Sequence, residues 1–217
     1  MKSDSSIYSE LVAAVKEDIP EFEVVDKQTS KFMKRLNKIV KIFNKDFMTW
    51  YVTTVYPRIY VPEALPMYMR WTVLSHEWIH LRSSKRSSAA FFLKYFFPLW
   101  LAPLAFLAFL AIPLTNWWLL NLLWLAMLAP LPSVSRMNEE LDGYTMTMGV
   151  HLWREGDILP TTREWIEQQF VSSAYYFMWP FKENMRKRVR QRAQDLTDGK
   201  YDNVYPYSKV REILTTN

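Results

Sequence analysis

The stretch "TVLSHEWIHLRSS", residues 72–84, places His76, Glu77 and His80 in an H-E-x-x-H pattern. Residues four apart lie on one face of an α-helix, so both imidazoles can reach a single metal ion. Glu77 lies beside that face, where its carboxylate reaches a metal-bound water but is poorly placed as a third ligand. Two of the three histidines of the chain belong to this pattern. The stretch therefore predicts a metal-binding helix, which we place at residues 66–81.

Composition restricts the class of protein. The 217 residues suit one domain, or one domain with an insertion, and the 50% apolar and 16% aromatic content excludes a disordered chain. The net charge of +5 does not choose between an anionic membrane and nucleic acid. Cysteine is absent, so any metal must be held by imidazole and carboxylate groups. The first ten residues, "MKSDSSIYSE", lack a signal-peptide pattern, and we therefore expect the chain to start in the cytoplasm.

A long apolar segment follows the metal-binding helix. Residues 95–132 contain no charged side chain, and a break at residues 113–116 divides the apolar region into stretches of roughly 26 and 17 residues, against about 17–25 for a membrane-spanning helix. Arg86 precedes the segment and Arg136 follows it, which predicts that both ends lie on the cytoplasmic side. We expect a transmembrane or re-entrant helical hairpin at residues 89–133, with the lipid bilayer as partner and the catalytic part on the cytoplasmic side.

Other segments predict ordinary secondary structure. Apolar residues at helical spacing indicate a basic amphipathic helix at residues 30–46 with Ser30 as N-cap, and β-branched and aromatic residues indicate an antiparallel β-hairpin at residues 47–61. Helices are expected at residues 134–153 and in the basic stretch "KENMRKRVRQRAQ". The expected organisation is an N-terminal segment (1–46), the β-hairpin and H-E-x-x-H helix (47–88), the apolar hairpin (89–133), a third-ligand helix with C-terminal helices (134–197), and a tail (198–217).

A catalytic metal needs a third protein ligand. The candidates are His151 and the carboxylates of "NEELDGY", residues 138–144. His151 follows Glu140 by eleven residues, which is roughly 16 Å along a continuous helix and too far for both to contact one ion. Glu139 and Glu140 point about 100° apart on a helix, so only one of them can face the metal.

These motifs resemble those of the gluzincin metallopeptidases. The likeness is closer to the membrane-embedded group of the CAAX prenyl protease and the bacterial heat-shock membrane protease, which place membrane helices between the H-E-x-x-H helix and the glutamate helix. Their third-ligand motif is E-x-x-A-D, and "ELDGY" at residues 140–144 matches it with Gly for Ala and Tyr for Asp. The frame from Glu139 instead puts Asp142 at the small position. The resemblance, which covers about residues 47–153, therefore favours Glu140 over Glu139.

The resemblance implies a minimal gluzincin-like zincin core of the α+β class, mostly α, with a small antiparallel β-hairpin and an inserted hydrophobic helical hairpin in the membrane. It implies that His76, His80 and Glu140 bind Zn2+ and that Glu77 deprotonates the zinc-bound water. Tyr144 stands where the family has an aspartate that supports a zinc-binding histidine, and we expect it to donate a hydrogen bond to the metal site or to the developing oxyanion. The expected function is a membrane-anchored zinc metalloendopeptidase acting on a peptide or protein substrate.

The resemblance also implies that a strand at residues 47–61 binds the substrate peptide by β-addition. Three alternatives remain open on sequence grounds. The metal site can be structural or inactive, the protein can act on membranes through its hairpin as a lysis-type protein, or the arginine-rich stretch at residues 186–192 can bind nucleic acid. The long apolar segment argues against nucleic acid. His151 is expected to be structural.

Overall fold

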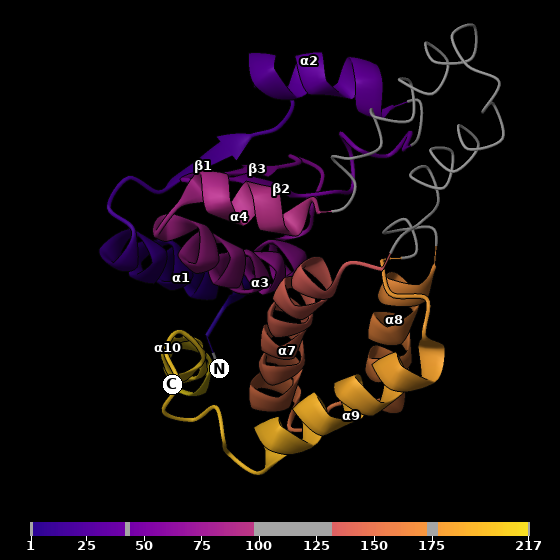
Figure 1. Cartoon of the computed structure of the whole chain (residues 1–217). Coiled ribbons are helices and arrows are strands. Elements are labelled where there is room, and N and C mark those ends of the chain that lie inside the picture. The colour runs from indigo at the N-terminus through magenta and orange to yellow at the C-terminus, as the bar shows by residue number, and fades with distance from the viewer. Residues whose placement is uncertain (1, 42–43, 98–131, 173–177, 217) are drawn as a thin grey trace, which may run out of the picture. The chain divides into compact units, whose positions relative to one another are not determined.

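The computed structural model describes residues 2–41, 44–97, 132–172 and 178–216 (Figure 1). The chain divides into two compact units, which are treated separately. Unit 1 comprises Met1–Ser88, Asp142–Ile158 and Ala193–Asn217, and unit 2 comprises Ala89–Leu141 and Leu159–Arg192.

The described residues form helices and one small sheet. The helices are α1 (Asp4–Asp18), α2 (Lys31–Val40), α3 (Met67–Lys85), α4 (Ser88–Tyr95), α7 (Val134–Glu155), α8 (Pro160–Val171), α9 (Lys182–Thr197) and α10 (Tyr207–Thr215). The strands are β1 (Glu23–Asp26), β2 (Thr53–Val55) and β3 (Arg58–Val61).

The sheet of unit 1 is three-stranded and mixed, with the order β1-β3-β2. Strand β2 pairs antiparallel with β3 across the turn at Tyr56-Pro57, which confirms the expected hairpin but confines it to residues 53–61. Strand β1 pairs parallel with β3. The expectation of a simple antiparallel hairpin is corrected by this third strand, whose sequence "EVVD" is too short and too acidic to stand out as a strand.

Each face of the sheet carries helices, because alternate side chains of a strand point to opposite faces. Ile59 and Val61 of β3 belong to the main core, where α1 and α3 pack, and Tyr60 packs on the other face with Met33 of α2. Figure 1 shows α2 on one side of the sheet and α1 and α3 on the other. Helix α2 begins as predicted, since the Ser30 hydroxyl accepts a hydrogen bond from the Met33 amide at 3.2 Å.

A buried lysine ties the segment before β2 to the end of β1. The Lys27 ammonium donates to the carbonyl oxygens of Phe47 and Tyr51, each at 2.6 Å, and to the Thr53 hydroxyl at 2.9 Å. It also lies 3.6 Å from the centroid of the Phe47 ring. The side chain is fully buried, and this burial lowers the pKa of Lys27 to about 7.

Helix α3 is confirmed where the sequence predicts it, and it packs tightly on α1. Trp78 is fully buried in the main core, and its indole N–H donates to the Asp18 carboxylate at 3.0 Å. Asp18 also pairs with Arg82 at 3.3 Å and with Lys85 at 3.1 Å. Trp78 therefore fixes α3 against α1.

The C-terminal residues, expected to form a tail, contain α10. Its buried residues Val210, Ile213 and Leu214 join the main core of unit 1. The Tyr207 hydroxyl donates to the Asp142 carbonyl oxygen at 2.9 Å and so fastens α10 to α7. Burial of these side chains makes α10 part of the packed structure of unit 1.

Helix α7 confirms the helix predicted at residues 134–153. It ends at Glu155, and the next residue, Gly156, has a φ of 86°, the left-handed conformation that terminates many helices. The helix runs without interruption through residues 141 and 142, where the two units divide.

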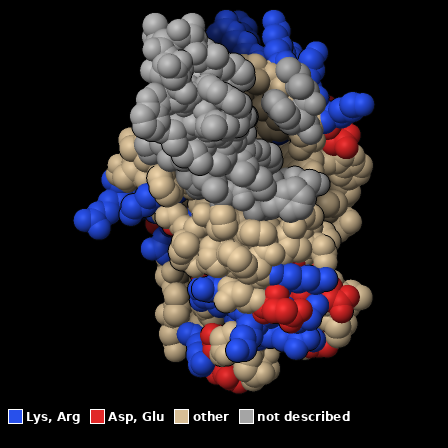
Figure 2. All heavy atoms as spheres, turned by 45° about the vertical axis from the view of Figure 1, so that its right-hand side comes forward, with Lys and Arg blue, Asp and Glu red and all other residues tan. Residues whose placement is uncertain are grey.

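Unit 2 contains α4, α8 and parts of α7 and α9. Helix α9 confirms the predicted basic helix, but acidic residues accompany its arginines. Arg186 pairs with the buried Glu167 at 3.3 Å and with Glu183 at 2.8 Å. The lower part of Figure 2 shows Lys and Arg side chains interspersed with Asp and Glu, whereas its top carries mainly Lys and Arg. The pairing weakens the nucleic-acid alternative, which needs a continuous basic surface.

The prediction of a membrane-inserted helical hairpin is corrected. Within the described ranges, no helix combines the length and the apolar character needed to cross a membrane. Helix α4 covers the described start of the predicted segment and has 8 residues, about 12 Å against a hydrocarbon core of about 30 Å. Residues 98–131 of the predicted hairpin lie outside the described residues. The fold class becomes mostly helical with a small mixed sheet, and the predicted membrane localisation loses its support.

Candidate metal centre

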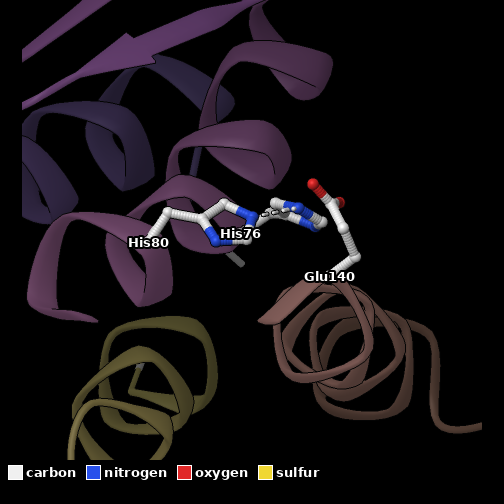
Figure 3. A group of neighbouring side chains, drawn as sticks. All are labelled: His76, His80 and Glu140. Atoms are coloured by element: carbon white, nitrogen blue, oxygen red, sulfur yellow. Dashed lines mark hydrogen bonds between the residues drawn. The ribbon is translucent and has the colours of Figure 1, made fainter. Parts of the chain in front are cut away.

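His76 and His80 of α3 form a pair of converging imidazoles. One helical turn separates them, and both side chains are buried. Their Nε2 atoms face each other at 3.2 Å, with the ring centroids 5.0 Å apart (Figure 3). The geometry follows from the i, i+4 spacing that the sequence predicts.

Glu140 of α7 completes a three-residue cluster with the two histidines. One ligand atom from each of His76, His80 and Glu140 lies within 4.8 Å of the others, and Glu140 is only 3% exposed. Figure 3 shows its carboxylate beside the imidazoles. Glu139, the alternative third ligand, is half-buried and does not belong to the cluster.

The spacing of these atoms fits a divalent metal ion. Two ligand atoms bound to one zinc ion at about 2.0–2.1 Å in tetrahedral geometry are roughly 3.4 Å apart. The Nε2–Nε2 distance of 3.2 Å agrees closely. Closing the 4.8 Å limit to that value needs a shift of at most about 1.4 Å, which rotation of a glutamate side chain supplies. Imidazole and carboxylate ligands suit zinc and several other divalent ions, so the donor set does not choose the metal.

Gly143 lets the backbone of α7 approach His76. A Cβ atom built at Gly143 would lie 2.6 Å from Nε2 of His76 and 2.7 Å from Cε1. No side chain fits in this gap unless the imidazole moves. This is a physical reason for a glycine three residues after Glu140.

Two further residues of α7 contact the His76 ring. Thr147 places its hydroxyl oxygen 3.2 Å from Nδ1. The ring of Tyr144 packs edge-on against the imidazole, with centroids 4.9 Å apart and an interplanar angle of 78°. Tyr144, predicted as a hydrogen-bond donor to the site, is thus placed beside His76, and its role as an oxyanion donor remains a prediction. The sequence did not single out Thr147.

Tyr95 of α4 holds the carboxylate of Glu140. Its hydroxyl donates to Oε1 of Glu140. The guanidinium of Arg136 lies 5.2 Å from the centroid of the Tyr95 ring. The sequence places Tyr95 only at the start of the apolar segment, because no local signal marks a tyrosine that contacts a residue 45 positions later.

Glu77 lies outside the three-residue cluster, as expected for a base rather than a ligand. Its side chain is half-buried, and its Oε2 atom accepts a hydrogen bond from the Thr54 hydroxyl at 2.7 Å. Thr54 belongs to β2, an edge strand of the sheet. The hydrogen bond fixes the orientation of the Glu77 carboxylate toward the edge strand.

His151 is not part of the cluster. Its Nδ1 atom lies 3.0 Å from the Glu155 carboxylate, one turn further along α7. The pair is partly exposed, and the structural role expected for His151 stays a prediction.

Comparisons of the chain with protein-family models, with curated proteins and with solved structures found no match.

Proposed function

We propose that the protein is a zinc-dependent metallopeptidase. The convergence of His76, His80 and Glu140 in one buried cluster carries the proposal, because the H-E-x-x-H spacing and a glutamate about sixty residues later meet at one point. Bound there, the ion would polarise the scissile carbonyl and lower the pKa of a coordinated water.

The residues of the chain supply the remaining functions. Glu77 takes a proton from the attacking water and delivers it to the leaving amine, which is the role of a general base that becomes a general acid. The Thr54 hydrogen bond restricts the rotation of the Glu77 carboxylate and so reduces the reorganisation needed during proton transfer. Strand β2, at an edge of the sheet, would present main-chain groups to an extended peptide substrate.

A structural metal site is the second candidate. His76, His80 and Glu140 are 8%, 6% and 3% exposed. Such deep burial favours a closed site, because structural zinc sites are sealed whereas catalytic sites keep a position open for water.

The test combines metal content with peptide cleavage. Plasma mass spectrometry on the purified chain is expected to find about one zinc per chain, and His80→Ala is expected to abolish binding. Cleavage is then followed on a mixture of denatured proteins by mass spectrometry of new termini. Glu77→Gln should keep the zinc and lose cleavage.

Equal cleavage by wild type and Glu77→Gln would overturn the proposed mechanism. Zinc binding without any cleavage would favour the structural site. A wild-type chain that binds no divalent metal would reject both functions.

A further inference from the structure

The Thr147 hydroxyl bridges His76 of α3 and the backbone of α7. Thr147 is 7% exposed, and its hydroxyl lies between Nδ1 of His76 at 3.2 Å and the carbonyl oxygen of Gly143 at 3.4 Å. All three groups belong to unit 1. The hydroxyl therefore links an imidazole of the metal cluster to the backbone of the neighbouring helix.

The bridge uses the single proton of the Thr147 hydroxyl, which is within hydrogen-bond distance of both the Gly143 carbonyl oxygen and Nδ1 of His76. Donation to the Gly143 carbonyl leaves the Thr147 oxygen to accept from a protonated Nδ1 of His76. In a neutral imidazole that leaves the lone pair on Nε2, the nitrogen that faces His80.

We propose that Thr147 is a positioning residue that holds His76 in the Nδ1-protonated tautomer and so presents Nε2 to the metal. The proposal rests on the proposed function for its metal and adds to it the residue that supports the first ligand. Groups that hold the second nitrogen of a metal-binding histidine orient the ring and fix its tautomer.

Thr147 thereby takes over a role that the family resemblance gives to an aspartate at the position of Tyr144. Thr147 follows Tyr144 by three residues, so both side chains lie on the same face of α7. Tyr144 packs against the ring of His76 while Thr147 holds its Nδ1 atom. The support has moved by about one turn and has become a neutral hydroxyl.

The first test measures zinc affinity in the full-length chain by competition with a chromophoric chelator. Thr147→Val keeps the shape of the side chain and removes the hydroxyl, and we expect affinity to fall about 10–100-fold. Thr147→Ser restores the hydroxyl and should remain within about threefold of wild type. Thr145→Val makes the same change at another buried threonine of α7 and controls for loss of stability. Equal affinities for Thr147→Val and Thr147→Ser would overturn the proposal.

The second test reads the tautomer directly and needs neither metal nor substrate. Long-range 1H–15N correlation spectra of the metal-free, 15N-labelled chain report which ring nitrogen carries the proton. The chain has three histidines, and variants lacking His80 or His151 assign the signals. Wild-type His76 should be protonated at Nδ1, and Thr147→Val should shift it toward the Nε2 form.

The outcomes separate the two proposals. An Nε2-protonated His76 in the metal-free wild type overturns the role of Thr147, even if Thr147→Val does not fold. If the wild type binds no zinc, the proposed function is rejected. If the same protein still shows an Nδ1-protonated His76 that Thr147→Val loses, the role of Thr147 in setting the tautomer is supported. If the wild type binds zinc and cleaves peptides, and Thr147→Val has the same zinc affinity, the role of Thr147 is rejected and the proposed function stands.

Discussion

Helices α3 and α7 both carry residues of the metal cluster, but they contribute different things. Helix α3 supplies both imidazoles and the proposed base from one short motif, His76 to His80. Helix α7 supplies one carboxylate, that of Glu140. It also contacts the His76 ring through the backbone at Gly143, which has no side chain, and through the hydroxyl of Thr147. Most of the chemistry thus comes from α3, and most of the support for its geometry comes from α7.

The supports of the two carboxylates differ in the same way. Glu140 is buried and is held by Tyr95, whereas Glu77 is half-buried and is held by Thr54 on the edge strand. Two identical functional groups therefore have different surroundings, and this difference separates a proposed ligand from a proposed base.

Glu140→Ala removes the only metal ligand proposed on α7. We expect zinc affinity to fall more than about 100-fold, beyond the loss typical of supporting residues, which is above about 2.7 kcal/mol. Chelator competition measures the loss, and Glu139→Ala on the same helix should leave affinity nearly unchanged. Similar losses in both variants would mean that α7 contributes charge rather than a specific ligand.

Lys27→Met tests the support of β2, the strand that holds Glu77. Between pH 7 and about 10 the folded chain binds fewer protons at Lys27 than the unfolded chain, because the folded pKa is about 7. Lys27 therefore makes the free energy of unfolding rise with pH across this window, by at most about 1.4 kcal/mol per pH unit. Urea denaturation at pH 7, 8 and 9 should show a smaller rise in Lys27→Met than in wild type. If the unfolding free energies of wild type and Lys27→Met change equally with pH, the protonation of Lys27 does not differ between the folded and unfolded chains.

Gly143→Ala tests the close approach of α7 to His76. The new methyl group displaces the imidazole, and we expect zinc affinity to fall about tenfold, or about 1.4 kcal/mol. Gly149→Ala is the matched control, because its Cβ would meet the Trp153 ring at 2.8 Å within the same helix. The control should lower thermal stability without weakening the metal site. Unchanged affinity in Gly143→Ala would show that His76 has room to move.

Thr54→Val removes the hydrogen bond that orients Glu77. The expected cost is about 0.5–1.5 kcal/mol of unfolding free energy, and the half-exposed setting of the pair favours the lower end. Chemical denaturation of the metal-free chain measures it, and Thr54→Ser should recover most of the loss. If Ser loses more stability than Val, the β-branched shape of Thr54 matters more than its hydroxyl.

Local spacing predicted the parts of the fold that depend on local sequence. The helical periods of α3, α7 and α9, the cap at Ser30 and the β2–β3 hairpin follow from residues close in the chain. Strand β1 was missed because its pairing with β3 joins segments about 35 residues apart. Helix α10 was missed although its buried residues recur at helical spacing, because its nine residues lie at the end of the chain, where we expected a tail.

The site divides along the same line. His76, Glu77 and His80 follow from one motif, while Glu140 was chosen over Glu139 only through a resemblance to a family. Thr54, Tyr95 and Thr147 were not singled out, because each meets its partner across a gap of at least 23 residues. A threonine or tyrosine has many ordinary uses, and only the folded geometry shows which one holds a particular carboxylate or imidazole.

Gly143 has a consequence for how the protein tolerates genetic change. Every missense substitution of a glycine adds at least a Cβ atom, and at this position that atom would meet the ring of His76. A deep mutational scan that selects for metal occupancy should therefore find Gly143 intolerant of substitution although it has no side chain, with Ala the least damaging replacement. The positions most sensitive to missense mutation would then include a glycine whose contribution is the absence of a side chain.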